Sequence, residues 1–206
     1  MFQPRSSRSY RFFCRRIALC VGLAFAAISG SGTDAPPSGY EVRFVGVPAR
    51  RLRRRLTQIS DAVKLRAHPP PSDTILLRRA EGDAPRIRDL LHSEGYLEAH
   101  TRVEIWEGPP RRVVFRIRPG PRYRLGRLSL QLGPLRPPKG SKIGFHGRMP
   151  FVSREILLAE KRLLDFIRTR GYPFPVLTNR VYRADSTNAR VHVTLAVDPR
   201  TRARFG

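Results

Sequence analysis

The sequence predicts an α+β protein built from two tandem modules, each a three-stranded mixed sheet with helices on one face. The first observation is the spacing of hydrophobic residues along the chain, which predicts a strand, two helices and two strands in that order. The second is that a similar order returns, with Gly-Tyr pairs at Gly95 and Gly171. The third is a composition that is 40% hydrophobic over 206 residues, enough for a packed core in one or two domains.

An N-terminal leader precedes these modules, and its pattern predicts a signal peptide over residues 1–35. Residues 1–16 are arginine-rich and lack acids, Ile17–Ile28 are apolar or glycine, and small residues follow. As a helix the apolar block rises about 18 Å, too short for a bilayer core of about 30 Å. Cleavage falls after Ala35 or several residues earlier. A mitochondrial presequence is the alternative, but it should be amphipathic, and the apolar block is unbroken.

The two cysteines, Cys14 and Cys20, both lie in the leader. The mature chain would therefore have no disulfide and no thiolate metal site. The strong positive charge would remain, because the formal net charge of +24 is carried along the whole chain. That charge indicates either an anionic partner, such as nucleic acid or a membrane, or the arginine-rich coding of a GC-rich genome.

The first module is expected over residues 36–121. An alternating strand over Tyr40–Val47 leads into one helix, with Leu52 and Leu56 on its apolar face. Residues 69–73 break that helix and cap a second helical region, which steps near Pro85. Two strands then follow at 100–107 and 112–118.

The last of these strands predicts an open-faced sheet. Val113, Phe115 and Ile117 form one face of this strand, and Arg112, Val114, Arg116 and Arg118 form the other. The helices can cover only one face of the sheet, so the arginine face is left to water.

The second module is expected over residues 122–200. A strand at 124–132 is followed by a Pro- and Gly-rich stretch in place of the first helix, and then by a helix at 153–172 capped by Ser153. Strands at 176–183 and 189–197 complete it. Residues 201–206, with RARFG like RYRLG at 122–126, are expected to start a truncated third module.

The Gly-Tyr pairs share one mechanism. Gly95 and Gly171 stand at the position where a residue in the left-handed conformation ends a helix. In a Schellman ending the side chain of the next residue packs onto the third-last helical residue, which pairs Tyr96 with Leu91 and Tyr172 with Ile167. The match occurs twice, each time before a hairpin, which indicates a repeat.

These motifs resemble a known family. RRAEGDAPRIRDLLHSEGYLEA followed by RVVFRIRPGPRYRLG is similar to the polypeptide-transport-associated (POTRA) domains of the TamA family, in the superfamily that includes BamA. The resemblance spans roughly residues 40–206. It implies a signal peptide, three periplasmic POTRA domains and a membrane β-barrel, of which we expect the leader, two modules and the start of a third in this sequence.

The resemblance implies a periplasmic scaffold for assembling outer-membrane proteins, including autotransporters. Such a scaffold would bind unfolded polypeptides by β-augmentation at open sheet edges, and an inner-membrane TamB-like partner would accompany a full-length protein. By family likeness the exposed edges are residues 100–107 and 176–183, and Arg102 and Arg180 would attract acidic clients. The expected contact residues are Arg102, Val103, Glu104, Trp106, Arg180, Val181 and Tyr182.

No catalytic or cofactor motif is found in the sequence. The five histidines (His68, His92, His100, His146 and His192) have no metal-ligand spacing, and no P-loop, GxSxG or HExxH occurs. We therefore expect no enzyme, no cofactor and no metal. The alternative function is a basic α/β nucleic-acid-binding protein, which the leader disfavours, because exported proteins rarely meet nucleic acid.

Overall fold

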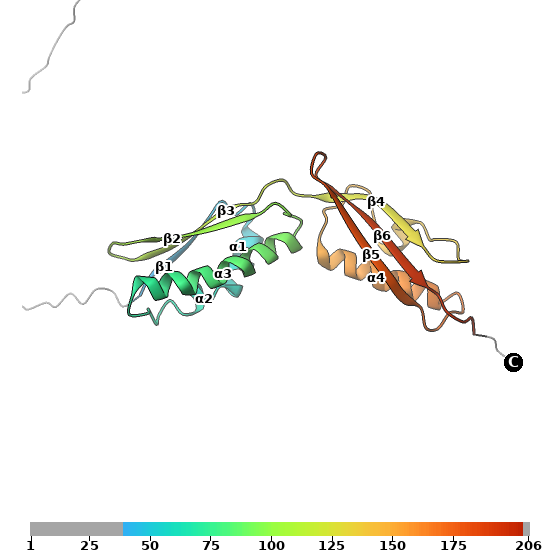
Figure 1. Ribbon diagram of the computed structural model, residues 1–206, viewed down its shortest axis with the longest axis horizontal. Coiled ribbons are helices and arrows are strands. Elements are labelled where there is room, and N and C mark those ends of the chain that lie inside the picture. Colours follow the sequence, from blue (N-terminus) through green and yellow to red (C-terminus); the bar gives the residue numbers. More distant parts are fainter. Residues whose placement is uncertain (1–38, 204–206) are drawn as a thin grey trace, which may run out of the picture. The chain divides into compact units, whose positions relative to one another are not determined.

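The computed structural model describes residues 39–203, so the leader predicted at 1–35 lies outside the described residues. Two separate three-stranded mixed sheets, each with helices on one face, make up the described chain (Figure 1). Each sheet has its own cluster of buried side chains. The predicted fold class is confirmed.

The first sheet consists of β1 (Glu41–Val45), β2 (His100–Trp106) and β3 (Arg112–Arg118), in the order β1-β3-β2. β3 is central, parallel to β1 and antiparallel to β2. Val113, Phe115 and Ile117 are buried beneath the helices, as their alternation predicts. Val114 faces the other way but is only 8% exposed, since the aliphatic stems of neighbouring arginines can cover apolar surface.

Three helices cover this sheet: α1 (Arg50–Ile59), α2 (Asp61–Lys64) and α3 (Asp73–Ser93). The prediction of one continuous helix before residue 69 is wrong, because the chain breaks at Ser60. Ser60 Oγ accepts a hydrogen bond from the Val63 N–H at 3.2 Å and donates to the buried Asp83 carboxylate at 2.7 Å. The N-terminus of α2 thus forms where the Asp83 carboxylate can accept hydrogen bonds from the groups that a helix start leaves unpaired.

The Asp83 carboxylate also accepts the backbone N–H groups of Asp61 and Ala62, at 3.0 and 2.9 Å. We expect Asp83→Ala to lower the free energy of unfolding by about 2–3 kcal/mol, because it orphans buried donors at the start of α2. Asp89→Ala, at an exposed position of the same helix, is the matched control. Urea denaturation measures the stability of both variants. Equal unfolding midpoints for Asp83→Ala and Asp89→Ala would show that the buried carboxylate is dispensable.

The predicted step at Pro85 does not occur, and α3 runs through it without interruption. Leu76, Ala80, Ile87 and Leu91 are fully buried on both sides of Pro85. This packing outweighs the loss of one backbone hydrogen bond at proline. Ser72 caps the helix as predicted, accepting the Ile75 N–H at 3.4 Å.

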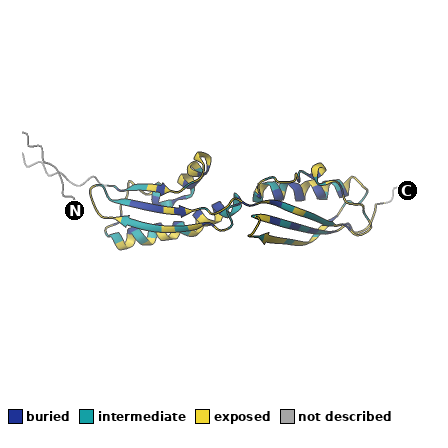
Figure 2. Ribbon diagram, turned by 90° about the horizontal axis from the view of Figure 1, so that it is seen from above, coloured by how far each residue is buried: buried dark blue, intermediate teal, exposed yellow. Residues whose placement is uncertain are grey.

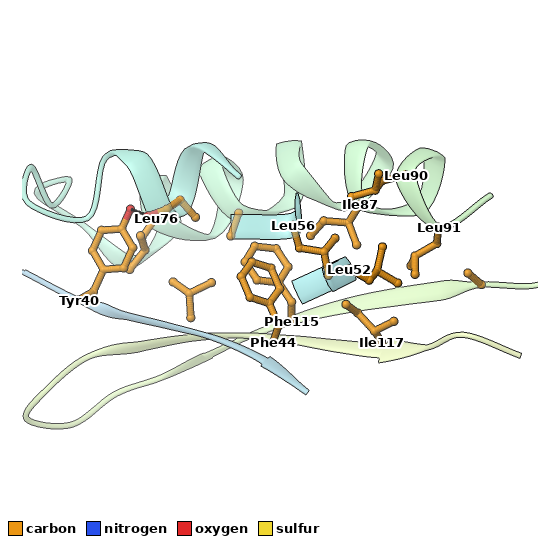
Figure 3. Close-up of a cluster of buried hydrophobic side chains, with 14 residues drawn as sticks. Tyr40, Phe44, Leu52, Leu56, Leu76, Ile87, Leu90, Leu91, Phe115 and Ile117 are labelled. Atoms are coloured by element: carbon orange, nitrogen blue, oxygen red, sulfur yellow. Dashed lines mark hydrogen bonds between the residues drawn. The ribbon is translucent and has the colours of Figure 1, made fainter. Parts of the chain in front are cut away.

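The first core is packed around two stacked rings (Figure 3). Phe44 of β1 and Phe115 of β3 lie with ring centroids 5.1 Å apart and nearly parallel planes, 15° apart. Leu56 and Ile87 pack above them from the helices. Tyr40 closes one end, and its hydroxyl donates to the Ala62 carbonyl at 2.7 Å. The central strand β3 is the most buried strand of this sheet (Figure 2).

The second sheet consists of β4 (Arg124–Gln131), β5 (Val176–Asp185) and β6 (Arg190–Asp198), in the order β4-β6-β5. Val191, Val193, Leu195 and Val197 of the central β6 point into the core. β4 pairs with β6 and not with a strand of the first sheet, so Arg124–Gln131 belongs to the second sheet.

A short 3-10 turn, η1 (Gly140–Ile143), replaces the first helix of this module, and α4 (Ser153–Arg168) is its only long helix among the described residues. The prediction that Ser153 caps α4 is wrong. Val152 is the N-cap residue, and Ser153 is already helical, without a side-chain capping bond. The packing of Phe151 into the core fixes where the chain enters the helix.

Both Gly-Tyr pairs end helices in the predicted backbone conformation. Gly95 and Gly171 have φ of +93° and +88°. After α3 both Schellman bonds form: Gly95 N–H to His92 O at 3.0 Å and Tyr96 N–H to Leu91 O at 3.0 Å. After α4 the Gly171 N–H bonds Arg168 O at 3.1 Å. Within residues 39–203, no helix has the length and apolar character that crossing a membrane requires.

Candidate polypeptide-binding edges

The strands predicted to be exposed edges, β2 and β5, are each one of the two outer strands of their sheets, the others being β1 and β4. Each pairs on one side with the central strand, β3 or β6, and has no strand partner on its other side among residues 39–203. The regular register of β2 covers its whole length. The register of β5 shifts between Leu177 and Asn179. Its regular edge is therefore Asn179–Asp185, because a bulge disrupts the pairing geometry before it.

β2 presents a polar face to the open side of the first sheet. Arg102 and Glu104 lie opposite Arg116 and Val114, and Trp106 beyond them is 54% exposed. The Arg116 guanidinium bonds Glu104 at 2.7 Å and holds the pKa of that carboxyl below its usual range. Val103 faces the other way and packs against the first core. The predicted contact residues of β2 are thus divided between the two faces.

Other arginines on this open face are also paired with acids. Glu41 forms ion pairs with Arg43 at 3.0 Å and Arg112 at 3.2 Å. The arginine face is therefore partly neutralised by the sheet's own carboxylates. Exposed ion pairs of this kind contribute little to stability, but they reduce the net field that a polyanion would meet.

On β5, Arg180 and Tyr182 point to the helix side of the second sheet, opposite Leu195 and Val193. The Arg180 guanidinium lies 2.8 Å from the Glu160 carboxylate of α4. The Tyr182 hydroxyl donates to the other Glu160 oxygen at 2.9 Å. Burial, together with this hydrogen bond, raises the pKa of Tyr182 to about 12. Arg180 is thus engaged by an internal acid, which weakens its expected attraction for acidic clients.

Glu160 is a functional candidate that the sequence analysis missed. It is only 4% exposed, and a buried carboxylate requires such partners. Its position offered a signal, because it stands four residues after Ile156 on the apolar stripe of α4. A charged residue on that stripe indicates a partner from another element, although the stripe cannot identify which one.

A cavity of about 460 Å³ lies beside Arg180 and Tyr182. Phe151, Ile156 and Leu157 line it with Ala184 and Val191. Leu157 is 57% exposed and Tyr182 is 44% exposed. The groove between β5 and α4 therefore offers apolar surface to solvent, next to an unpaired strand edge.

The other face of β5 borders a polar groove on the open side of the second sheet. Asn179, Val181 and Arg183 line it from β5, His192 from the neighbouring β6, and Arg127 from β4 on the far side of β6. His192 Nδ1 accepts the Arg127 backbone N–H at 2.9 Å. Over residues 39–203 no cluster of three His, Cys, Asp or Glu side chains is arranged to hold a metal ion.

Comparison with known proteins gives similarity to solved structures only. The POTRA3-5 fragment of BamA from Haemophilus influenzae is 18% identical with a TM-score of 0.42, over 80% of this chain and 67% of that one. POTRA1-3 of the periplasmic domain of Omp85 from Anabaena is 15% identical with a TM-score of 0.45, over 78% of this chain and 59% of that one. BamA from Haemophilus ducreyi lacking POTRA domains 1-3 is 16% identical with a TM-score of 0.41, over 77% of this chain and 28% of that one.

No protein-family model matches the sequence, and no curated protein matches it. At these identities and TM-scores the neighbours describe a likeness only, and they decide nothing about activity. The functional proposal rests instead on the edges and surfaces of this chain.

Proposed function

We propose that residues 36–121 and 122–200 are two POTRA-like modules of a periplasmic scaffold that binds extended polypeptides by β-augmentation. The observation that carries the proposal is the strand order, which places β2 and β5, like β1 and β4, at the outer edges of their sheets. An outer strand presents a row of backbone donors and acceptors, and an extended client satisfies them by adding a strand.

The motifs around Gly95 and Arg118 support a scaffold of the TamA type. In this proposal the leader directs export to the periplasm, at the outer membrane in the full-length protein. The clients are unfolded outer-membrane or autotransporter polypeptides, and a TamB-like protein is the inner-membrane partner. The proposed role is not enzymatic, and the binding residues are those of the two edges.

Site-specific photo-crosslinking tests the proposal. A photo-reactive residue at Arg102 or Val181 is expected to capture an unfolded outer-membrane polypeptide. The same group at Glu81 or Lys161, exposed positions on α3 and α4, is the matched control. Capture that is confined to the helix positions would contradict β-augmentation, even if the chain binds clients.

Nucleic-acid binding is the competing function, favoured by the net charge of +24. The pairing of Arg112 and Arg116 with Glu41 and Glu104 speaks against a continuous phosphate-binding row. Affinity for duplex DNA that falls steeply with salt, and DNA that displaces the polypeptide, would favour this alternative.

A further inference from the structure

β5 has two chemically different sides, and they constrain which polypeptide can pair with it. Side chains alternate between the faces of a sheet, so a client strand added to β5 would send its own side chains alternately to the helix side and to the open side. The following inference rests on the proposed function, because it assumes that a strand adds at this edge.

The helix side offers an apolar site. Phe151, Leu157 and Tyr182 line the cavity of about 460 Å³ there. The one buried acid nearby, Glu160, is already satisfied by Arg180 at 2.8 Å and by Tyr182 at 2.9 Å. The site therefore does not require a cationic ligand, and the exposed lining favours a large apolar side chain.

The open side is basic. Arg127 and Arg183 line the groove with His192, Asn179, Gln131, Val181 and Thr194, and the lining contains no carboxylate. Neither arginine forms an ion pair with another of the described residues. The carboxylate of Asp185, further along β5, is engaged by Asn188 at 2.8 Å. An acidic client side chain would find complementary charge at this groove.

We propose that the β5 edge selects extended segments in which large apolar residues alternate with acidic ones. The apolar side chains enter the cavity between β5 and α4, and the acidic side chains face the basic open side, nearest to Arg183 of β5 and attracted also by Arg127 across the groove. Backbone pairing supplies the register, and the two sides supply the selectivity.

Binding of two synthetic peptides to the purified chain, followed by fluorescence anisotropy, tests this selection. One peptide alternates phenylalanine with glutamate over the length of β5, and the other alternates phenylalanine with lysine. We expect the glutamate peptide to bind about tenfold or more tightly than the lysine peptide. The double variant Arg127→Glu/Arg183→Glu should reverse that order.

Two further variants separate the contributions. Arg78→Glu/Arg88→Glu makes the same change in net charge at exposed positions of α3 and should preserve the preference for glutamate. Leu157→Asp, which places a charge in the apolar lining, should weaken the binding of the glutamate peptide about tenfold.

The outcomes distinguish the two proposals. Equal binding of both peptides, or reversal by the α3 double variant as well, overturns the selection but leaves strand addition intact. If neither peptide binds and the edge positions capture no client, both the selection and the proposed function are wrong.

Discussion

Gly95→Val is expected to lower the free energy of unfolding by more than about 2 kcal/mol. Gly95 has φ of +93°, where a branched side chain is strained. A Cβ there would also lie 2.6 Å from the Phe151 carbonyl oxygen and 3.3 Å from that of Tyr123. Both neighbours are backbone atoms and cannot move aside as a side chain could.

The position is further fixed by hydrogen bonds through Tyr123. Its N–H donates to the Gly95 carbonyl at 2.8 Å, and its own carbonyl accepts the Phe151 N–H at 2.9 Å. Its hydroxyl bonds Glu98, and that bond, with burial, raises the pKa of Tyr123 to about 12. A shift of the chain at Gly95 would disturb this set of contacts.

Gly171→Val is the matched comparison. Its φ of +88° imposes similar strain, but the nearest atom to a Cβ is in the Arg202 side chain, 3.5 Å away. We expect a loss of about 1–2 kcal/mol, from the backbone alone. Gly82→Ala, in α3 with nothing within 4 Å, should not destabilise. Urea denaturation of the three variants checks the ranking, and equal losses at Gly95 and Gly171 would show that the contact with Phe151 does not matter.

Proline in β5 is expected to abolish most client binding at that edge. Successive backbone N–H groups in a strand point to opposite sides, so one of Val181→Pro and Tyr182→Pro removes a donor that faces away from β6. That variant should keep its fold and bind the glutamate peptide at least about tenfold more weakly. The other variant removes a donor inside the sheet and should unfold the second module.

Circular dichroism shows which proline variant stays folded and which one unfolds before affinity is measured. Thr178→Pro, at the register shift before the regular edge, is the control and should affect affinity less. A folded proline variant at 181 or 182 that binds with unchanged affinity would rule out main-chain pairing along β5.

The sequence predicted most of the fold because its signals are local. The alternation of Val113, Phe115 and Ile117 assigns a strand and its buried face, since the side-chain period is two. Gly95 and Gly171 mark helix ends because the left-handed conformation favours glycine. The break at Ser60 escaped prediction because its cause is Asp83, which is distant in sequence.

For the candidate site, the sequence by itself determined that two strands follow each Gly-Tyr pair and which of their residues share a face. Only the tertiary structure decided that Arg180 and Tyr182 converge on Glu160 and that an apolar cavity lies beside them. A periodicity shows on which side of its own element a residue lies. It does not show which residue of another element comes within hydrogen-bonding distance, because packing between α4 and β5 sets that partner.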